Sequence, residues 1–217
     1  MALTATRTAR SERDRILAAL LAEVDELAGH DLLALPAHRV AELGVARTFQ
    51  HLGLVPSLSV RENVMLGAQA GVGVGFLAAA VRLPGVRTRE RELRDRADAV
   101  LDRLALADIA ARPAAGLPYG TLKRIELARA LAAAPDLLML DEPASGLSHE
   151  EVDELAGVIE DVRADMTVLL VEHHMGMVMR LSDTVVVLDF GRVVATGPPA
   201  QVREDPAVLA AYLGTPA

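Results

Sequence analysis

Two short segments built almost entirely from apolar residues constrain the fold more than any other feature of the sequence. They are DLLML at 136–140 and MTVLLV at 166–171, and predicted helices follow them at 149–163 and 174–181. A strand that is apolar on both faces has to be covered on both faces, and strands of this kind alternate with helices in parallel sheets. The second half of the chain therefore predicts an α/β fold, with a parallel sheet covered by helices on both sides.

The rest of the chain is predicted to be mostly helical before these strands and to end in a β-hairpin. Helices are expected at 11–28, 37–43, 59–67, 88–106 and 121–134, with one strand at 44–49. The buried stripe of the helix at 88–106 is expected to consist of Leu93, Ala97, Val100, Leu101 and Leu104. The segment TVVVLDFGRVVA predicts a hairpin that turns at 189–191. An all-helical insertion is thus expected between about residues 55 and 120.

Composition limits the classes of function. The 217 residues are 52% hydrophobic but only 2% aromatic, which predicts one aliphatic core, or a core with a smaller subdomain. The absence of cysteine excludes disulfide frameworks and thiolate metal sites. A net charge of −8 disfavours general binding to nucleic acid, whose backbone is also negative. Residues 1–15 lack the apolar core of a signal peptide and the apolar stretch 70–81 is too short to span a bilayer, so we expect a soluble cytoplasmic protein.

Acidic and imidazole side chains follow both apolar strands. Asp141 and Glu142 come directly after the first strand, and Glu172 and His173 come after the second. Ligands of parallel sheets bind beyond the carboxyl ends of the strands, so both pairs are expected at one rim. An Asp-Glu pair there suits a magnesium–nucleotide site, in which the aspartate holds the metal and the glutamate polarises an attacking water. The alternative is that the pair simply begins a polar loop, and the pair alone leaves both interpretations open.

A longer stretch around the acidic pair resembles a known family. The segment LPYGTLKRIELARALAAAPDLLMLDEPASGL, residues 117–147, is similar to the part of ABC-transporter ATP-binding subunits that runs from the signature motif through Walker B to the D-loop. On this resemblance the signature positions are filled by Leu117, Pro118, Tyr119, Gly120 and Thr121, and the D-loop positions by Ser145, Gly146, Leu147 and Ser148. The segment ARTFQ places Gln50 at the family's Q-loop glutamine, and VLLVEHH places His173 at its switch histidine. The order and approximate spacing of all five elements match, which rarely arises by chance.

The resemblance implies an α/β, ABC-type nucleotide-binding domain with a RecA-like parallel sheet core and an inserted helical subdomain. It covers residues 22–217, with the helical subdomain at about 55–120 and an importer-type C-terminal tail at about 197–217. The segment 1–21 is divergent, and its polar, Arg-rich residues 1–15 lie in place of the family's first strand and phosphate-binding loop. The core is therefore expected to be N-terminally incomplete.

The resemblance also implies ATP and Mg²⁺ as ligands and gives roles to single residues. Asp141 and Gln50 would hold Mg²⁺, whereas Glu142 and His173 would be catalytic. The signature and D-loop positions would contact ATP, with the N–H groups at Gly120 and the helix dipole meeting a phosphate. The residue-level alternatives are structural: Gln50 on the surface, His173 satisfied at a strand end, and Gly120 as a plain helix start. We expect Tyr119 to pack rather than bind and His174 to be structural or exposed, and we expect Met175, Met177 and Met179 to lie in the core.

Two further stretches resemble one branch of this family. GVARTFQHLGLVPSLSVRENVMLGA and GPPAQVREDPAVLAAYLG are similar to the ATP-binding subunits of branched-chain amino acid importers. This resemblance implies membrane permease subunits, a second ATP-binding subunit in a homo- or heterodimer, and indirectly a solute-binding protein as partners. It also implies a position at the cytoplasmic face of the cell membrane. A soluble ABC protein of repair or translation is disfavoured by the acidic charge and the importer-like tail.

The sequence departs from the family pattern at the phosphate-binding loop. The 217 residues contain no G-x-x-x-x-G-K-[ST], and their only lysine, Lys123, follows the signature positions. Pro118 replaces the usual signature serine, and Ser148 stands where many D-loops carry an acid. Two functions therefore remain open: an ATP-hydrolysing importer subunit, or a non-catalytic subunit that only completes a partner's ATP site through its signature motif.

Overall fold

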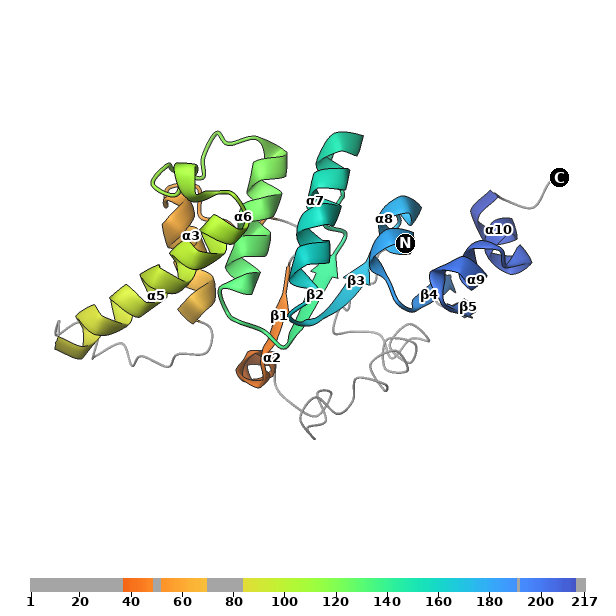
Figure 1. Cartoon of the computed structure of the whole chain (residues 1–217), viewed down its shortest axis with the longest axis horizontal. Helices are drawn as coiled ribbons and strands as arrows, with labels where there is room; N and C mark the ends of the chain where they lie inside the picture. The colour runs from red at the N-terminus through yellow and green to blue at the C-terminus, as the bar shows by residue number, and fades with distance from the viewer. Residues whose placement is uncertain (1–36, 49–51, 70–83, 191, 214–217) are drawn as a thin grey trace.

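The computed structural model describes residues 37–48, 52–69, 84–190 and 192–213 (Figure 1). The predicted helix at 11–28, the apolar stretch 70–81 and Gln50 lie outside these ranges. A helical region occupies one end of the described chain, the parallel strands lie in the middle, and a hairpin with two short helices forms the other end. Within the described ranges, no helix is both long and apolar enough to span a bilayer.

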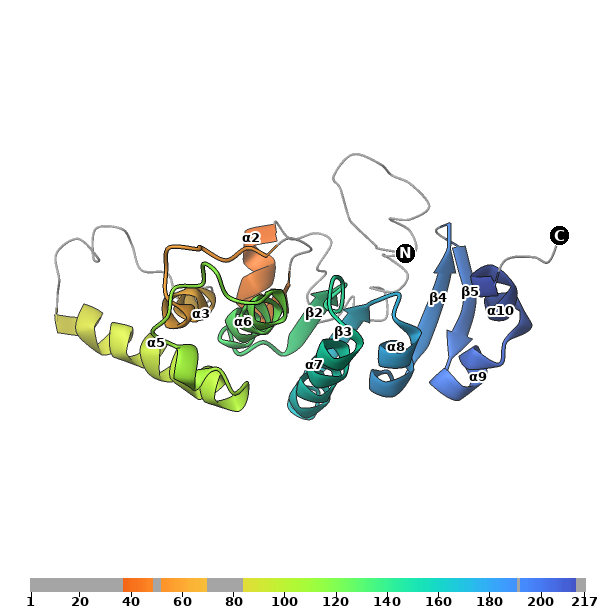
Figure 2. The same ribbon diagram turned by 90° about the horizontal axis from the view of Figure 1, so that it is seen from above.

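The central sheet consists of three parallel strands in the order β1–β2–β3. They are β1 (Val45–Arg47), β2 (Leu137–Asp141) and β3 (Thr167–Val171), with Val45 opposite Leu137 and Asp141 opposite Val171. Helices α6 (Tyr119–Leu131) and α7 (His149–Val162) lie on one side of this sheet (Figure 2), where Leu138 and Leu140 join their apolar core. The α/β prediction and the parallel sheet are confirmed.

The burial of the two apolar strands differs. β2 is buried along nearly all of its length, whereas the residues of β3 are half-buried or exposed. Among the described residues β3 pairs only with β2, and a cavity of about 540 Å³ lies beyond β3, between it and β4 (Val185–Asp189). The prediction that both strands are fully covered is therefore wrong for β3, because its outer edge faces this cavity.

The helical region is built from α3 (Val60–Ala68), α5 (Pro84–Arg103) and the short 3₁₀ helix η3 (Ala107–Ile109), preceded by α2 (Ala37–Val40) and the 3₁₀ helix η1 (Ala41–Leu43). The start of α3 is a capping box, in which Ser59 and Glu62 bond each other's backbone N–H groups. The Ser59 hydroxyl and N–H donate to Glu62 and hold the pKa of its carboxyl below the usual value. The stripe predicted for 88–106 is confirmed, with four members buried and Val100 packed beside them. The boundaries of a subdomain at about 55–120 stay a prediction.

The C-terminal region is a hairpin followed by two helices. Strand β4 pairs antiparallel with β5 (Arg192–Gly197), as predicted, and Phe190 at the turn is 89% exposed. Helices α9 (Pro199–Arg203) and α10 (Pro206–Leu213) follow, and Val185, Val202 and Val208 form a second small core there. The remaining helix, α8 (Met175–Leu181), contacts α7 and α9 and so lies between the two cores.

Candidate functional site

Asp141 ends the central strand and is almost completely buried, with 5% of its surface exposed. Its Oδ2 accepts a hydrogen bond from Arg47 Nη2 at 2.9 Å, and its N–H donates to the hydroxyl of Thr48 at 3.3 Å. Its other oxygen, Oδ1, is buried and has no hydrogen-bond partner among the described residues. A buried carboxylate oxygen without a donor is costly unless something else binds it, so this atom is free to act as a ligand.

Glu142 lies next to Asp141 at the same rim as the end of β3. Its N–H donates to the carbonyl of Val171 at 2.8 Å, so the hydrogen bonding between β2 and β3 continues through Glu142. The loops that follow the two strands diverge beyond this bond. The φ angle of Glu142 is +47°, a left-handed conformation that a residue with a side chain adopts only when its surroundings impose it. The structure thus brings the acidic pair and the Glu172–His173 pair to one rim, as the parallel sheet predicted.

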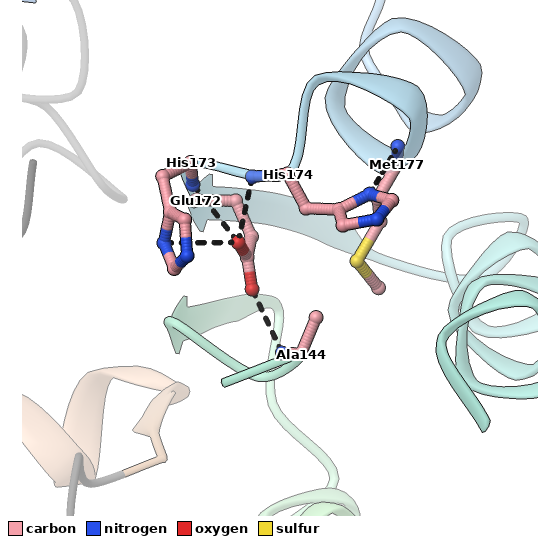
Figure 3. A network of polar contacts seen from close by, with 5 residues as sticks. All are labelled: Ala144, Glu172, His173, His174 and Met177. Carbon is pink, nitrogen blue, oxygen red and sulfur yellow. Dashed lines mark hydrogen bonds and ion pairs between the residues drawn. The ribbon is translucent and has the colours of Figure 1, made fainter. Parts of the chain in front are cut away.

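His173 and His174 differ in their surroundings, as Figure 3 shows. The side chain of His173 is 57% exposed, and its Nδ1 lies 3.6 Å from the buried carboxylate of Glu172. His174 instead caps α8, since its Nδ1 accepts the N–H of Met177 at 3.4 Å. The structural role expected for His174 is confirmed, and His173 remains accessible at the rim. Met177 is buried and Met179 packs against the second core, as expected, whereas Met175 is half-buried and lines the cavity beside β3.

The signature positions form the start of α6. Leu117 is buried in the main core, whereas Pro118 and Tyr119 are exposed, and the N-terminus of α6 has no side-chain cap. The ring of Tyr119 lies against Gly146, where a Cβ would come within 3.0 Å of its Cε1. This contact places the signature and D-loop positions side by side, and it agrees with the packing role expected for Tyr119.

The D-loop positions form a tight turn between β2 and α7. Ser145 N–H donates to the Glu142 carbonyl, Gly146 has a φ of +80°, and Leu147 packs against the main core. Ser148 makes a capping box with Glu151 at the start of α7. Ser148 therefore has a structural role as the N-cap of α7.

Comparisons with known proteins identify the family. The family model described as "ABC transporter" matches residues 13–145, more than half of the chain. The chain belongs to the ABC transporter ATP-binding family. A second model, described as "Branched-chain amino acid ATP-binding cassette transporter", matches residues 192–217.

Individual relatives agree with this family. The branched-chain amino acid transport ATP-binding protein BraF of Pseudomonas aeruginosa is 40% identical over 190 residues, which cover 87% of this chain and 74% of BraF. LivG of Escherichia coli, which carries the same description, is 40% identical over 84% of this chain and 72% of its own length. Among solved structures, the ADP conformation of the ABC-transporter cassette MJ1267 has a TM-score of 0.71 and 25% identity, covering 86% of this chain and 74% of that one. A nucleotide-free ATP-binding cassette of an ABC transporter has a TM-score of 0.70 and 24% identity, covering 86% of this chain and 75% of that one. This second likeness supports the fold alone.

The rim around Asp141 has the chemistry of a partial Mg²⁺ site. Asp141 Oδ1 is an orphaned, buried carboxylate oxygen, which is a ligand that Mg²⁺ prefers. The described residues contain no group of three or more side chains of the kind that cages a metal. This set still fits Mg²⁺, which is commonly held by one or two carboxylates together with phosphate oxygens and water. Gln50, the second metal ligand predicted from the sequence, lies outside the described residues.

Two neighbours of the site were not predicted from the sequence. Arg47 neutralises one oxygen of Asp141, because β1 lies beside β2 and ends at the same rim. Glu151 lies against Gly120, where any added Cβ would overlap its carboxylate. This second neighbour puts a negative charge beside the signature glycine, which opposes an anion there and partly offsets the attraction of the uncapped helix. In the sequence, these two neighbours were visible only as an arginine at the end of a strand and an acid in the first turn of a helix.

Proposed function

We propose that this chain is the ATP-binding subunit of an ABC importer for branched-chain amino acids, in which ATP binding and hydrolysis are coupled to transport. The match of residues 192–217 to the branched-chain family, in a chain 40% identical to BraF and LivG, carries the proposal. The signature turn, the acidic rim of β2 and the D-loop are adjacent in the fold, which is the arrangement that such a subunit needs. This arrangement supports the general function, and the C-terminal match supports the substrate class.

Within this function each rim residue has a proposed role. Asp141 Oδ1 would hold Mg²⁺, and the metal would neutralise charge on the phosphates of ATP. At a complete nucleotide site, Glu142 would orient a water and accept its proton, and the exposed His173 would stabilise charge on the terminal phosphate. Both residues would be idle if this chain supplies only its signature turn to a partner's site. Gly120, in the uncapped first turn of α6, would offer backbone N–H groups to the phosphate of a nucleotide held by a partner.

We further propose that this chain works as one half of a pair. The residues printed above include no G-x-x-x-x-G-K-[ST], and Lys123 is 5% exposed with its Nζ 5.7 Å from the centre of the Tyr119 ring. That lysine is therefore not placed to grip a phosphate. A second ATP-binding subunit that carries a phosphate-binding loop would hold the nucleotide, and the signature turn of this chain would complete its site.

The proposed role of the chain in uptake can be tested by deleting its gene in the host. We expect uptake of labelled leucine, isoleucine and valine at low external concentration to fall to background, because an importer without its ATP-binding subunit has no source of energy. The wild-type gene should restore uptake, while uptake of an unrelated amino acid should not change in any strain. Unchanged uptake of all three branched-chain amino acids would contradict the proposed substrate class.

We propose that the helical region meets the permease at the cytoplasmic face of the membrane, with a solute-binding protein delivering the amino acid from the other side. Val55 and Leu66 are exposed apolar side chains of this region, and Leu209 on α10 is a similarly exposed control. Photo-crosslinkers at Val55 and Leu66 should label the permease in host membranes, whereas one at Leu209 should not. Labelling from Leu209 alone would show that the C-terminal region makes the contact instead.

A further inference from the structure

The carboxylate of Glu172 connects two loops of the site (Figure 3). Its Oε1 accepts the N–H of Ala144 at 2.7 Å, in the loop after β2. Its Oε2 accepts the N–H groups of His173 at 2.9 Å and His174 at 3.1 Å, in the loop after β3. The side chain is completely buried, although the neighbouring His173 is largely exposed.

The bond to Ala144 reaches the centre of a strained turn. Ala144 lies between Glu142, whose φ is +47°, and Gly146, whose φ is +80°. The N–H of Leu147 in turn donates to the carbonyl of Ala144, at 3.2 Å. Left-handed backbone of this kind persists only where surrounding contacts fix it, and a hydrogen bond to a buried charge is among the stronger contacts a loop can make.

We propose that Glu172 is a positioning residue that holds the D-loop, residues 145–148, in register with the loop that carries His173. A displacement of either loop is transmitted through one rigid carboxylate, because both loops donate to the same side chain. The inference rests on the proposed function, in which the D-loop and the loop of the switch histidine both belong to the nucleotide-binding rim of the chain. Glu172 would not touch the nucleotide itself, and it would act through the two loops and through its approach to His173 Nδ1 at 3.6 Å.

The test uses Glu172→Gln, which keeps the shape of the side chain but replaces one acceptor oxygen with an N–H₂ donor. In the purified chain, amide hydrogen exchange should accelerate by at least about ten-fold at Ala144 or at His173 and His174, as expected when a bond to a charged acceptor is lost. Exchange in α6 and α7 should stay at the wild-type rate. Glu160→Gln, which removes an exposed partner of Arg180, is the matched control and should leave the site amides unchanged.

Other outcomes would overturn the inference. A uniform rise in exchange across the chain would mean that Glu172 only stabilises the fold. No rise at these amides would mean that the hydrogen bonds of Glu172 do not hold the two loops in place. If Glu172→Gln does not fold, amide exchange in the wild-type chain still tests whether Glu172 protects the loop after β2. Its Ala144 amide should exchange more slowly than the amide of Gly146, which has no acceptor among the described residues, after correction for intrinsic rates.

A functional readout separates this inference from the proposed function. In an assembly that hydrolyses ATP, Glu172→Gln should lower kcat while leaving the KM for ATP unchanged, because the D-loop is displaced but the nucleotide cradle of the partner is intact. A change in KM alone would contradict the positioning role. If the wild-type assembly shows no ATP hydrolysis, the proposed function fails, while the exchange measurement still decides whether Glu172 links the two loops.

Discussion

Gly120→Asp should abolish ATP hydrolysis by the transporter assembled with a partner that carries a phosphate-binding loop, whereas Glu142→Gln should change it little. The new carboxylate would stand at the N-terminus of α6, where the partner's phosphate has to approach, and beside Glu151, which already occupies the adjacent space. Two like charges about 4 Å apart near a protein surface repel by about 4 kcal/mol, which is roughly a 1,000-fold effect on a rate. Under the half-site proposal Glu142 acts on no nucleotide, because the 217 residues contain no G-x-x-x-x-G-K-[ST] to hold one beside it.

Gly157→Asp is the matched control for Gly120→Asp. Gly157 lies within α7, and an added Cβ there would meet only Arg180 Nη2, at 3.9 Å. This control should keep wild-type hydrolysis, and circular dichroism melting should show that both aspartate variants remain folded. If Glu142→Gln removes as much activity as Gly120→Asp, this chain contributes more than its signature turn.

Several elements could be predicted because the signal was local. Ser59 and Ser148 each precede a glutamate by three residues, and both begin helices with capping boxes. The rim was predictable for a related reason, since parallel strands bring their carboxyl ends to one edge. Asp141 lies opposite Val171 in the sheet, so the residues that follow the two strands meet there.

Other features depended on packing between segments far apart in the sequence. The apolar residues of MTVLLV, which contains β3, indicated a strand with two buried faces. They could not indicate what lies beside that strand, and β3 is only half-buried because one edge faces a cavity. The pairing of Arg47 with Asp141 required knowing that β1 and β2 are neighbours. The approach of Glu151 to Gly120 required the packing of α7 against the start of α6. None of these follows from spacing along the chain.

The 217-residue chain by itself should bind Mg-ATP no more tightly than about 1 mM and hydrolyse it at the background rate. A dissociation constant of 1 mM corresponds to about −4 kcal/mol and one of 1 μM to about −8 kcal/mol. A phosphate-binding loop supplies several charge-assisted hydrogen bonds, each worth about 1.5–3 kcal/mol, so two of them already cover that difference. Asp141 can hold Mg²⁺ through Oδ1, but Lys123 is buried in α6 and Arg47 is engaged with Asp141.

Isothermal titration of the purified chain with Mg-ATP, together with an ATPase assay, tests most directly whether this chain supplies one half of a shared nucleotide site. If the chain supplies only half of the site, we expect no heat of binding below millimolar nucleotide and no turnover above background, and Glu142→Gln should behave like the wild type. Titration with magnesium alone is the control for binding at Asp141. Micromolar affinity with a turnover that Glu142→Gln abolishes would contradict the account and would mean that the chain forms a complete ATP site of its own.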